Sequence, residues 1–339
     1  AEIQCGFDAF GEEVLRELIY HKKIHHMIKV IKRIRYQYVL FVMFFKKKII
    51  DRASVNSGKK DNSIFFIFGS GRNGSTLLAR LLNTHSQIFL PPEQFALPYT
   101  IIDWHSSLFK NPLYYTKKQL KRYFTNNQNW IWNTSDLSSL EEKIDHTGIR
   151  PRSLFKVVLQ YYSELSVGKK EVFGDHSPIT TSFYKYIYDE FPQDKYIFLL
   201  RHPYDVVLSY SKILNNPASN SVIACNKWNN SINAYDYLIN KGAKVILIRY
   251  EDLVTKTDET LAEILNFLEV KSQDLTKEKI ENIEKSLGTK FQNHHKNLFN
   301  PINSSSVNKW KVDLDSDLAL DIHKYLIKNS LRFNYDLNR

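Results

Sequence analysis

Residues 64–78 read IFFIFGSGRNGSTLL, and they combine an apolar run, a glycine-rich loop and the start of a helix. Five consecutive apolar, mostly aromatic residues are typical of a strand that is covered on both faces. The three glycines that follow allow backbone conformations that a side chain would obstruct. Ser75 and Thr76 then open a helix with leucines at helical spacing, and the unpaired amides of a helix start attract anions. The stretch predicts an anion-binding strand, loop and helix, with an ordinary glycine turn as the alternative.

The loop departs from the nucleotide-binding pattern of glycine, four residues, glycine, lysine, and serine or threonine. Gly69, Gly74 and Thr76 fit this pattern, but Ser75 stands where the lysine is required. That lysine contacts the β- and γ-phosphates of a nucleoside triphosphate, and the hydroxyl after it holds magnesium. The loop is therefore poorly equipped for triphosphate chemistry. Arg72 offers a cation three residues nearer the strand.

The composition indicates a folded protein whose positive charge is concentrated near its N-terminus. The chain has 339 residues, 43% of them hydrophobic, which is enough for a large core. Residues 1–60 contain thirteen Lys and Arg against six Asp and Glu, a surplus of seven in a net charge of +11. Because so little of the charge belongs to the remaining residues, we expect no nucleic-acid partner. Two cysteines and no zinc-like histidine spacing lead us to expect no metal.

Residues 18–50 contain no acidic residue and carry isoleucines at helical spacing among lysines and arginines. This pattern suits a helix at an anionic membrane surface, or a helix packed on the core with its cationic face in water. Residues 38–45 are apolar but too few to cross a bilayer, which needs about 20. We expect a basic helical arm at 1–60 and one main domain at 61–339. Because the chain begins at Ala1, a removed signal or membrane span upstream is an open alternative.

Further strands and helices alternate along the rest of the chain. We expect a short strand within 171–178 that ends in a turn, and buried strands at 195–200 and at 244–248. We expect helices that end at Glu190, start at Pro203, and cover 218–240, 258–268, 275–286 and 315–330. Such alternation indicates a parallel sheet with right-handed crossovers, and ligands of these sheets lie at the carboxyl ends of the strands. Arg72, His176, Arg201 and Tyr250 each follow a strand, so we expect them around one crevice.

Residues 103–165 read as helical material rich in aromatic residues. We expect this insertion on the acceptor side of the crevice. Its rings suit core packing or a pocket wall better than stacking on nucleic acid.

Four separate motifs resemble the sulfotransferases that use 3′-phosphoadenosine 5′-phosphosulfate (PAPS). The motifs are Gly71-Arg72-Asn73-Gly74-Ser75-Thr76, Leu200-Arg201-His202-Pro203-Tyr204-Asp205 with Ser209, Ile248-Arg249-Tyr250-Glu251-Asp252-Leu253-Val254, and Ser305-Ser306-Val307-Asn308-Lys309-Trp310. Their order and spacing over residues 63–335 resemble those of the Golgi protein-tyrosine and carbohydrate sulfotransferases and their bacterial relatives. The resemblance implies an α/β fold like that of P-loop-containing nucleoside triphosphate hydrolases, with a parallel sheet flanked by helices.

The resemblance also implies the ligands. PAPS would be the co-substrate, and the acceptor would be a hydroxyl group of a glycan, a lipid or a protein tyrosine. A sulfuryl group carries one charge fewer than a phosphoryl group, which is consistent with transfer without magnesium. The implied nucleotide-binding residues are Gly71, Arg72, Asn73, Gly74, Ser75, Thr76, Arg201, Ser209, Tyr250, Ser306 and Lys309.

Three residues are the candidates for catalysis. Glu93 lies shortly after the first helix, where this branch has a glutamate that acts as the base. A solvent-exposed glutamate titrates near pH 4.3, so base catalysis requires a closed pocket that raises the pKa of Glu93. Arg72 would stabilise charge on the sulfuryl and phosphate oxygens. His176 stands where relatives commonly have a lysine, and it carries charge only when protonated. His85 is a weaker candidate base.

Two other functions compete with sulfuryl transfer. One is a divergent nucleotide kinase, against which the missing loop lysine argues. The other is a nucleotide-binding relative that has lost turnover, and His176 is the irregularity that supports it.

Overall fold

The computed structural model describes five ranges of the chain, and these are residues 63–94, 96–106, 151–213, 216–273 and 302–338. The predicted arm at 1–60, residues 107–150 of the aromatic insertion and the helix expected at 275–286 lie outside the described residues. None of the described helices is both long enough and apolar enough to span a membrane.

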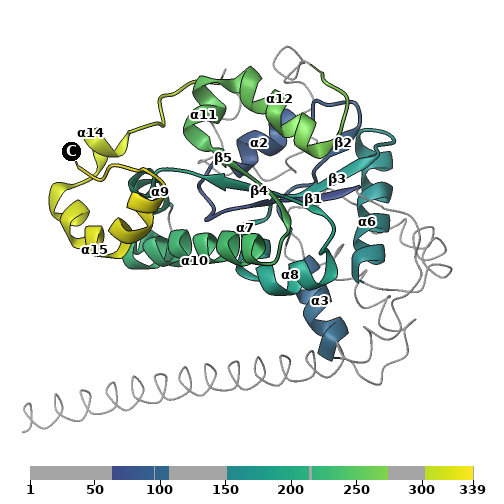
Figure 1. Cartoon of the computed structure of the whole chain (residues 1–339), viewed down its shortest axis with the longest axis horizontal. Helices are drawn as coiled ribbons and strands as arrows, with labels where there is room; N and C mark the ends of the chain where they lie inside the picture. Colours follow the sequence, from purple (N-terminus) through teal and green to yellow (C-terminus); the bar gives the residue numbers. More distant parts are fainter. Residues whose placement is uncertain (1–62, 95, 107–150, 214–215, 274–301, 339) are drawn as a thin grey trace, which may run out of the picture. The chain divides into compact units, whose positions relative to one another are not determined.

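The described residues contain one five-stranded sheet in the order β2-β3-β1-β4-β5, with every neighbouring pair parallel (Figure 1). The strands are β1 (Ile64–Phe68), β2 (Ile88–Phe89), β3 (Val172–Asp175), β4 (Lys195–Leu200) and β5 (Lys244–Arg249). The central strand β1 pairs Phe66 with Asp175 of β3 and Phe68 with Phe198 of β4. The predicted parallel sheet is confirmed, and three of its strands lie within a residue or two of their expected bounds.

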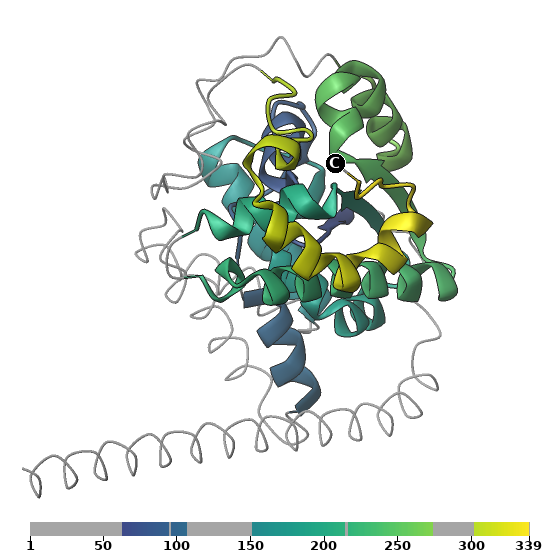
Figure 2. The ribbon, with the colours of Figure 1, turned by 90° about the vertical axis from the view of Figure 1, so that its left-hand side faces the viewer.

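Helices connect the strands and surround the sheet. They are α2 (Ser75–Leu82), α3 (Ala96–Ser106), α6 (Pro151–Ser166), α7 (Pro178–Ser182), α8 (Tyr184–Glu190), α9 (Pro203–Ser211), α10 (Ser221–Asn240), α11 (Tyr250–Thr255), α12 (Thr257–Leu268), α14 (Trp310–Asp313) and α15 (Ser316–Arg332). The C-terminal helices α14 and α15, yellow in Figure 2, pack against α9, and α15 also packs against α10.

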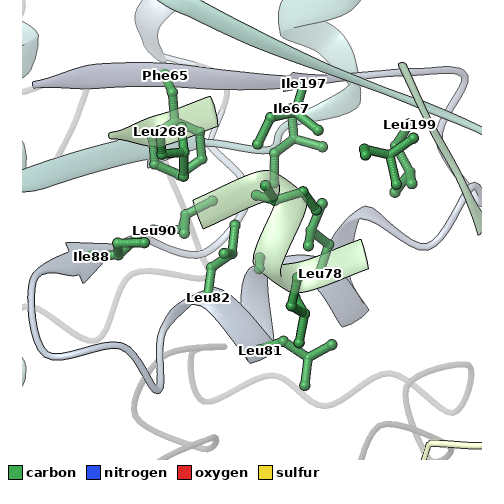
Figure 3. Close-up of a cluster of buried hydrophobic side chains, with 14 of the residues drawn as sticks. Phe65, Ile67, Leu78, Leu81, Leu82, Ile88, Leu90, Ile197, Leu199 and Leu268 are labelled. Carbon is green, nitrogen blue, oxygen red and sulfur yellow. The ribbon is translucent and has the colours of Figure 1, made fainter. Parts of the chain in front are cut away.

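The central strand is buried on both faces because its side chains alternate between two helical layers. Phe65 and Ile67 pack in an aliphatic cluster with leucines of α2 and α12 (Figure 3). Phe66 points the other way, where its ring packs against Phe155 of α6. The helix α10 covers the same face, because Tyr235 contacts Phe198 of β4. The apolar run at 64–68 is therefore fully used as core, as its lack of alternation predicts.

Some predicted element bounds are wrong. The helix expected to end at Glu190 is broken at Phe183, where the backbone turns out of helical geometry between α7 and α8. The Phe183 ring packs against Tyr99, so a tertiary contact overrides the helical pattern. The long helix begins at Ser221 rather than at Ala218, because the side chain of Asn220 accepts a hydrogen bond from the Ile223 amide and caps it. The short helix α11 was not expected at all.

Candidate active site

The loop after β1 has an unusual backbone. Gly71, Arg72 and Gly74 have φ values of 73°, 56° and 95°, in the left-handed region. A non-glycine residue such as Arg72 rarely adopts this conformation, and residues that do often lie at functional sites. A Cβ atom on Gly74 would come within 2.4 Å of the Tyr250 ring, so no side chain fits there. The glycines thus allow Tyr250, the first residue of α11, to lie directly against the loop.

Three hydrogen bonds fix this loop to the elements around it. The Asn73 side chain donates to the Leu199 carbonyl at 2.8 Å, which ties the loop to β4. The Tyr210 hydroxyl donates to the Ser70 carbonyl at 2.7 Å, and the Gly69 amide donates to Thr181 at 3.0 Å. The side chain of Asn73 therefore supports the loop from within the protein, where it is only 1% exposed.

The loop leads directly into α2, which begins at Ser75 with Gly74 as its N-cap. Ser75 is buried and Thr76 is half-buried at the first turn. The first amides of a helix point away from its body and carry the positive end of its dipole. This start is therefore suited to an anionic group held against the loop.

Two arginines that follow different strands, Arg72 after β1 and Arg201 after β4, meet at the loop. The Arg72 side chain donates to the Ser209 hydroxyl of α9 at 3.1 Å. Arg201, just past β4, donates to the Arg72 carbonyl at 2.9 Å and to the Ser306 carbonyl at 2.6 Å. Its guanidinium carbon lies 4.4 Å from the centre of the Tyr250 ring. The structure thus brings together five of the residues that the sequence predicts to bind nucleotide.

Arg201 retains capacity for a further ligand. Its side chain is 8% exposed, and its Nε atom is buried with no hydrogen-bond partner among the described residues. Its hydrogen bonds go to neutral carbonyls, and the Asp205 carboxylate interacts with its charge electrostatically. A phosphate group beside Arg201 would supply both an acceptor and further negative charge.

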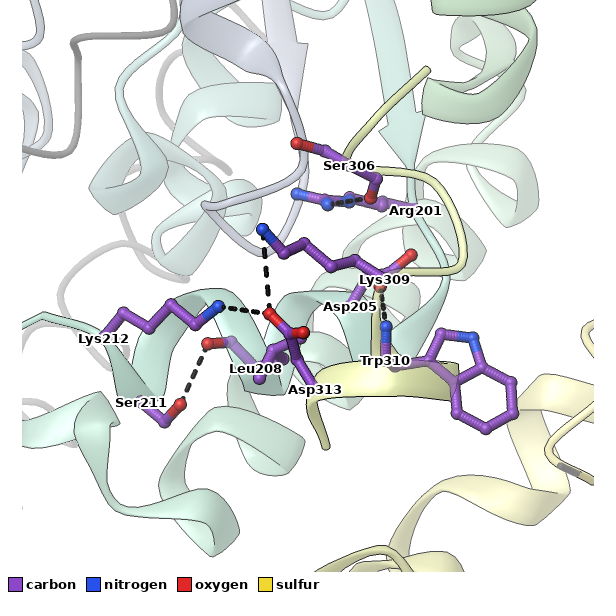
Figure 4. A network of polar contacts seen from close by, with 9 residues as sticks. All are labelled: Arg201, Asp205, Leu208, Ser211, Lys212, Ser306, Lys309, Trp310 and Asp313. Carbon is purple, nitrogen blue, oxygen red and sulfur yellow. Dashed lines mark hydrogen bonds and ion pairs between the residues drawn. The ribbon is translucent and has the colours of Figure 1, made fainter. Parts of the chain in front are cut away.

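The segment 302–310 reaches this place because Asp205 of α9 holds it. The Asp205 carboxylate accepts hydrogen bonds from the main-chain amides of Asn308 and Trp310, both at 2.9 Å. Figure 4 shows the bond from Trp310. Lys309 is exposed, and its ammonium group lies 3.7 Å from Asp313. Ser306 contributes its carbonyl to Arg201, as described above. The loop is therefore seated by its backbone, and the side chain of Lys309 extends toward solvent.

Glu93 lies in the segment between β2 and α3, and its side chain is half-buried. Desolvation raises the pKa of Glu93 to about 7, although the positive charges of Arg72 and Lys227 act in the opposite direction. Burial lowers the pKa of Arg72, while Tyr210 and Glu93 favour its charged form. The structure thus places the predicted base within electrostatic reach of the loop cation. A carboxyl group with this pKa can accept a proton near neutral pH.

A buried hydrogen-bond network fixes the segment that carries Glu93. The Gln94 side chain donates to Asp175 of β3 at 2.9 Å, and the Gln94 amide donates to Ser177 at 2.8 Å. Ser177 and Thr180 both donate to the Asp175 carboxylate, at 2.8 and 2.6 Å. Asp175 is 1% exposed, so these bonds are shielded from water. Sequence reasoning missed this network, because nothing in the spacing of Gln94 and Asp175 shows that they meet.

The two candidate histidines have different surroundings. His176 is buried, and its Nε2 atom lies 3.1 Å from the Pro91 carbonyl, which can only accept a hydrogen bond. His85 lies beyond the far end of α2, where its ring bonds to the Lys271 carbonyl and to the Gln87 amide. Both nitrogens of His85 are therefore occupied in holding loops together.

Comparisons with known proteins agree with this geometry. The model of the family described as "Sulfotransferase family" matches residues 65–274. Protein-tyrosine sulfotransferase of Drosophila melanogaster is 22% identical over 284 residues, which cover 80% of this chain and 52% of that protein. Protein-tyrosine sulfotransferase 1 of Danio rerio is 22% identical over 274 residues, covering 78% and 70%. The chain thus spans about half the length of the first of these relatives.

A solved structure supports the same assignment. The sulfotransferase domain from the Synechococcus PCC 7002 olefin synthase superposes with a TM-score of 0.56 at 25% identity, covering 84% of this chain and 98% of that domain. The family match begins within β1 and continues through the loop, Arg201 and the helices after β5. The matched region is most of the described chain, and the chain belongs to the sulfotransferase family.

Proposed function

We propose that this chain transfers the sulfuryl group of PAPS to an acceptor hydroxyl. The observation that carries the proposal is the convergence of the loop after β1, Arg201 and Ser209 at the carboxyl ends of β1 and β4. The buried Nε of Arg201 gives this place an unsatisfied donor that fits an anion. Membership of the sulfotransferase family implies PAPS as the donor.

The nucleotide would lie across the loop. Backbone amides from Gly71 to Thr76 would hold the 5′-phosphosulfate at the start of α2. Arg201 and Ser209 would bind the 3′-phosphate. Tyr250 keeps Arg201 in place through its ring, and the segment with Ser306 and Lys309 would close over the nucleotide.

Glu93 would act as the base. The acceptor hydroxyl gives its proton to the Glu93 carboxylate while its oxygen attacks sulfur. The bond from sulfur to the 5′-phosphate oxygen breaks, and adenosine 3′,5′-bisphosphate leaves with that electron pair. Arg72 belongs to the loop and lies within electrostatic reach of Glu93, where it would offset the negative charge on the sulfuryl and phosphate oxygens. His176 would position the segment with Pro91 beside the acceptor.

The nucleotide site is tested by thermal stability. Wild type and Arg201→Ala are melted with adenosine 3′,5′-bisphosphate, with ATP plus magnesium, and with adenosine 5′-phosphate. The bisphosphate at 100 times its dissociation constant should contribute about 2.7 kcal/mol, which is a readable shift in melting temperature. This shift should be lost in Arg201→Ala. Stabilisation by ATP plus magnesium instead would indicate phosphoryl transfer and contradict the proposal.

Transfer is tested with radiolabelled PAPS and three acceptor types, namely a tyrosine peptide, a glycan and a hydroxylated lipid. Glu93→Gln should abolish turnover and retain the stabilisation by the bisphosphate. Activity that survives in Glu93→Gln would place the base elsewhere. Nucleotide binding without transfer by wild type to any acceptor or to water would favour a relative that has lost turnover.

A further inference from the structure

Lys227 brings a further positive charge close to the loop. Lys227 lies on α10, the helix that covers the face of the sheet opposite α2, and its side chain is half-buried. Its ammonium nitrogen is 5.7 Å from the centre of the Tyr210 ring. Among the described residues it makes no hydrogen bond or ion pair. The charged group that acts on this ammonium is Glu93, but no anion described in the structure bonds to it directly, so an anionic ligand would stabilise it.

Tyr210 connects this lysine to the loop. Its hydroxyl donates to the Ser70 carbonyl, and a Cβ atom on Gly71 would lie 2.4 Å from the same hydroxyl. The ring of Tyr210 is therefore in close contact with the first half of the loop, and Lys227 lies over that ring. This half of the loop is the end nearer β1. The start of α2, which would bind the 5′-phosphate, is the other end.

A cavity of about 260 Å³ joins the two places. Gly69 and Ser70 line it from the loop, Pro178 and Thr181 line it from α7, and Lys227 lines it from α10. Lys227 and the strand end of the loop thus line one space.

The charges around Lys227 identify where its ammonium group acts. Glu93 interacts electrostatically with both Lys227 and Arg72, so the predicted base lies within reach of two cations. From α9 the titratable neighbour is Tyr210, and α7 contributes no charged side chain. Asp175 of β3 acts on Glu93 but is bonded to Gln94, Ser177 and Thr180. His176 is directed to the Pro91 carbonyl.

We propose that Lys227 is a catalytic residue that binds the sulfuryl oxygens during transfer, opposite Arg72. The inference rests on the proposed function, because it requires the 5′-phosphate at the start of α2 and the sulfuryl group on the side of the loop nearer β1. Lys227 remains protonated throughout. The proton moves from the acceptor to Glu93, the acceptor oxygen bonds to sulfur, and the leaving phosphate keeps the electrons of the broken bond.

The test compares Lys227→Gln and Lys227→Arg with Lys212→Gln. Lys212 is an exposed lysine that pairs with Asp313, so its replacement controls for the loss of one positive charge. The probes are radiolabelled PAPS with the three acceptors named above and with water alone. Lys227→Gln should lower kcat about 100-fold, while stabilisation by adenosine 3′,5′-bisphosphate and the melting temperature stay close to wild type. Lys227→Arg should recover part of kcat, and Lys212→Gln should retain all of it.

Three results would overturn the inference. A wild-type kcat in Lys227→Gln shows that the ammonium group does not act in transfer. A raised KM for the acceptor at unchanged kcat assigns Lys227 to acceptor binding. A deficit that disappears at high pH shows that Lys227 acts only through the pKa of Glu93, because losing the cation raises that pKa. If wild type is neither stabilised by the bisphosphate nor active, the proposed function itself fails. If wild type is active and one of the three results above is found, only the role of Lys227 is wrong.

Discussion

Glu93 changes its charge within the physiological pH range, because desolvation raises its pKa to about 7. As the base it must be ionised before the acceptor binds, so kcat/KM should rise with pH and level off above about 7. A pH series of initial rates with saturating PAPS measures this rise and plateau of kcat/KM. A profile that is flat from pH 5 to 8 would contradict the assignment of Glu93 as the base.

The same carboxyl group affects folding. Its native pKa is raised, so the native state binds the proton more tightly than the unfolded state does. The free energy of unfolding should therefore fall as pH rises from about 4.5 to about 7 and lose nothing more from this group above that. Glu93→Gln should be more stable than wild type at pH 8 and gain nothing at pH 4. Urea denaturation at the two pH values measures the difference, and equal gains at both would argue against a buried carboxylate.

Gly74 offers a second test on a single residue. Gly74→Ala combines a φ of 95° with a Cβ atom 2.4 Å from the Tyr250 ring. Gly242→Ala is the matched control, because its φ is 67° but no atom lies within 4 Å of the added Cβ. We expect about 1 kcal/mol of destabilisation from backbone strain in the control and several in Gly74→Ala. Gly74→Ala should also weaken nucleotide binding. Equal losses in the two variants would mean that the contact with Tyr250 is unimportant.

Asp205 joins two elements that lie far apart in the sequence, α9 and the segment 302–310. Because its carboxylate accepts two main-chain amides of that segment, Asp205→Ala should release the segment and weaken binding of the bisphosphate. Hydrogen exchange should accelerate at Asn308 and Trp310. Asp313→Ala is the control, since it removes only surface ion pairs with Lys212 and Lys309. Such exposed pairs are screened by water and contribute little to stability. If Asp313→Ala accelerates exchange as much as Asp205→Ala, surface charge seats the segment.

The strands were more predictable than the connections between them. β4 has the predicted bounds because Lys195 is followed by five apolar residues, a run that is typical of a strand covered on both faces. The break at Phe183 was not predictable, since the contact with Tyr99 that favours it is made by a residue far away in sequence. The order of the motifs indicated that Arg72, Arg201 and Tyr250 follow strands that could meet. Their mutual contacts, the Asp175 network and the place of Lys227 depend on the packing of α7, α9 and α10, which no local pattern contains.

At the level of the whole chain, we propose that the basic segment 18–50 contacts anionic membranes. The segment lies outside the described residues. The proposal rests on the surplus of seven positive charges in residues 1–60 and on the amphipathic spacing within the segment. Full-length protein should sediment with vesicles that contain phosphatidylserine and not with phosphatidylcholine vesicles. Removal of residues 1–60 should abolish sedimentation and leave stabilisation by the bisphosphate intact. Binding that survives about 1 M salt would contradict an electrostatic contact.

The central position of β1 also has a consequence for synthesis of the chain on the ribosome. β1 is the first of the described strands to be made, but its partners in β3 and β4 follow roughly 110 and 130 residues later. At about 5–20 residues per second, its five apolar residues wait on the order of ten seconds for a neighbour. During that time they form a short, uncharged, aromatic segment of the kind that aggregates. The feature that makes β1 the centre of the finished sheet thus leaves an aggregation-prone segment of the nascent chain exposed until its partners are made, and a chaperone that binds short apolar segments would protect it.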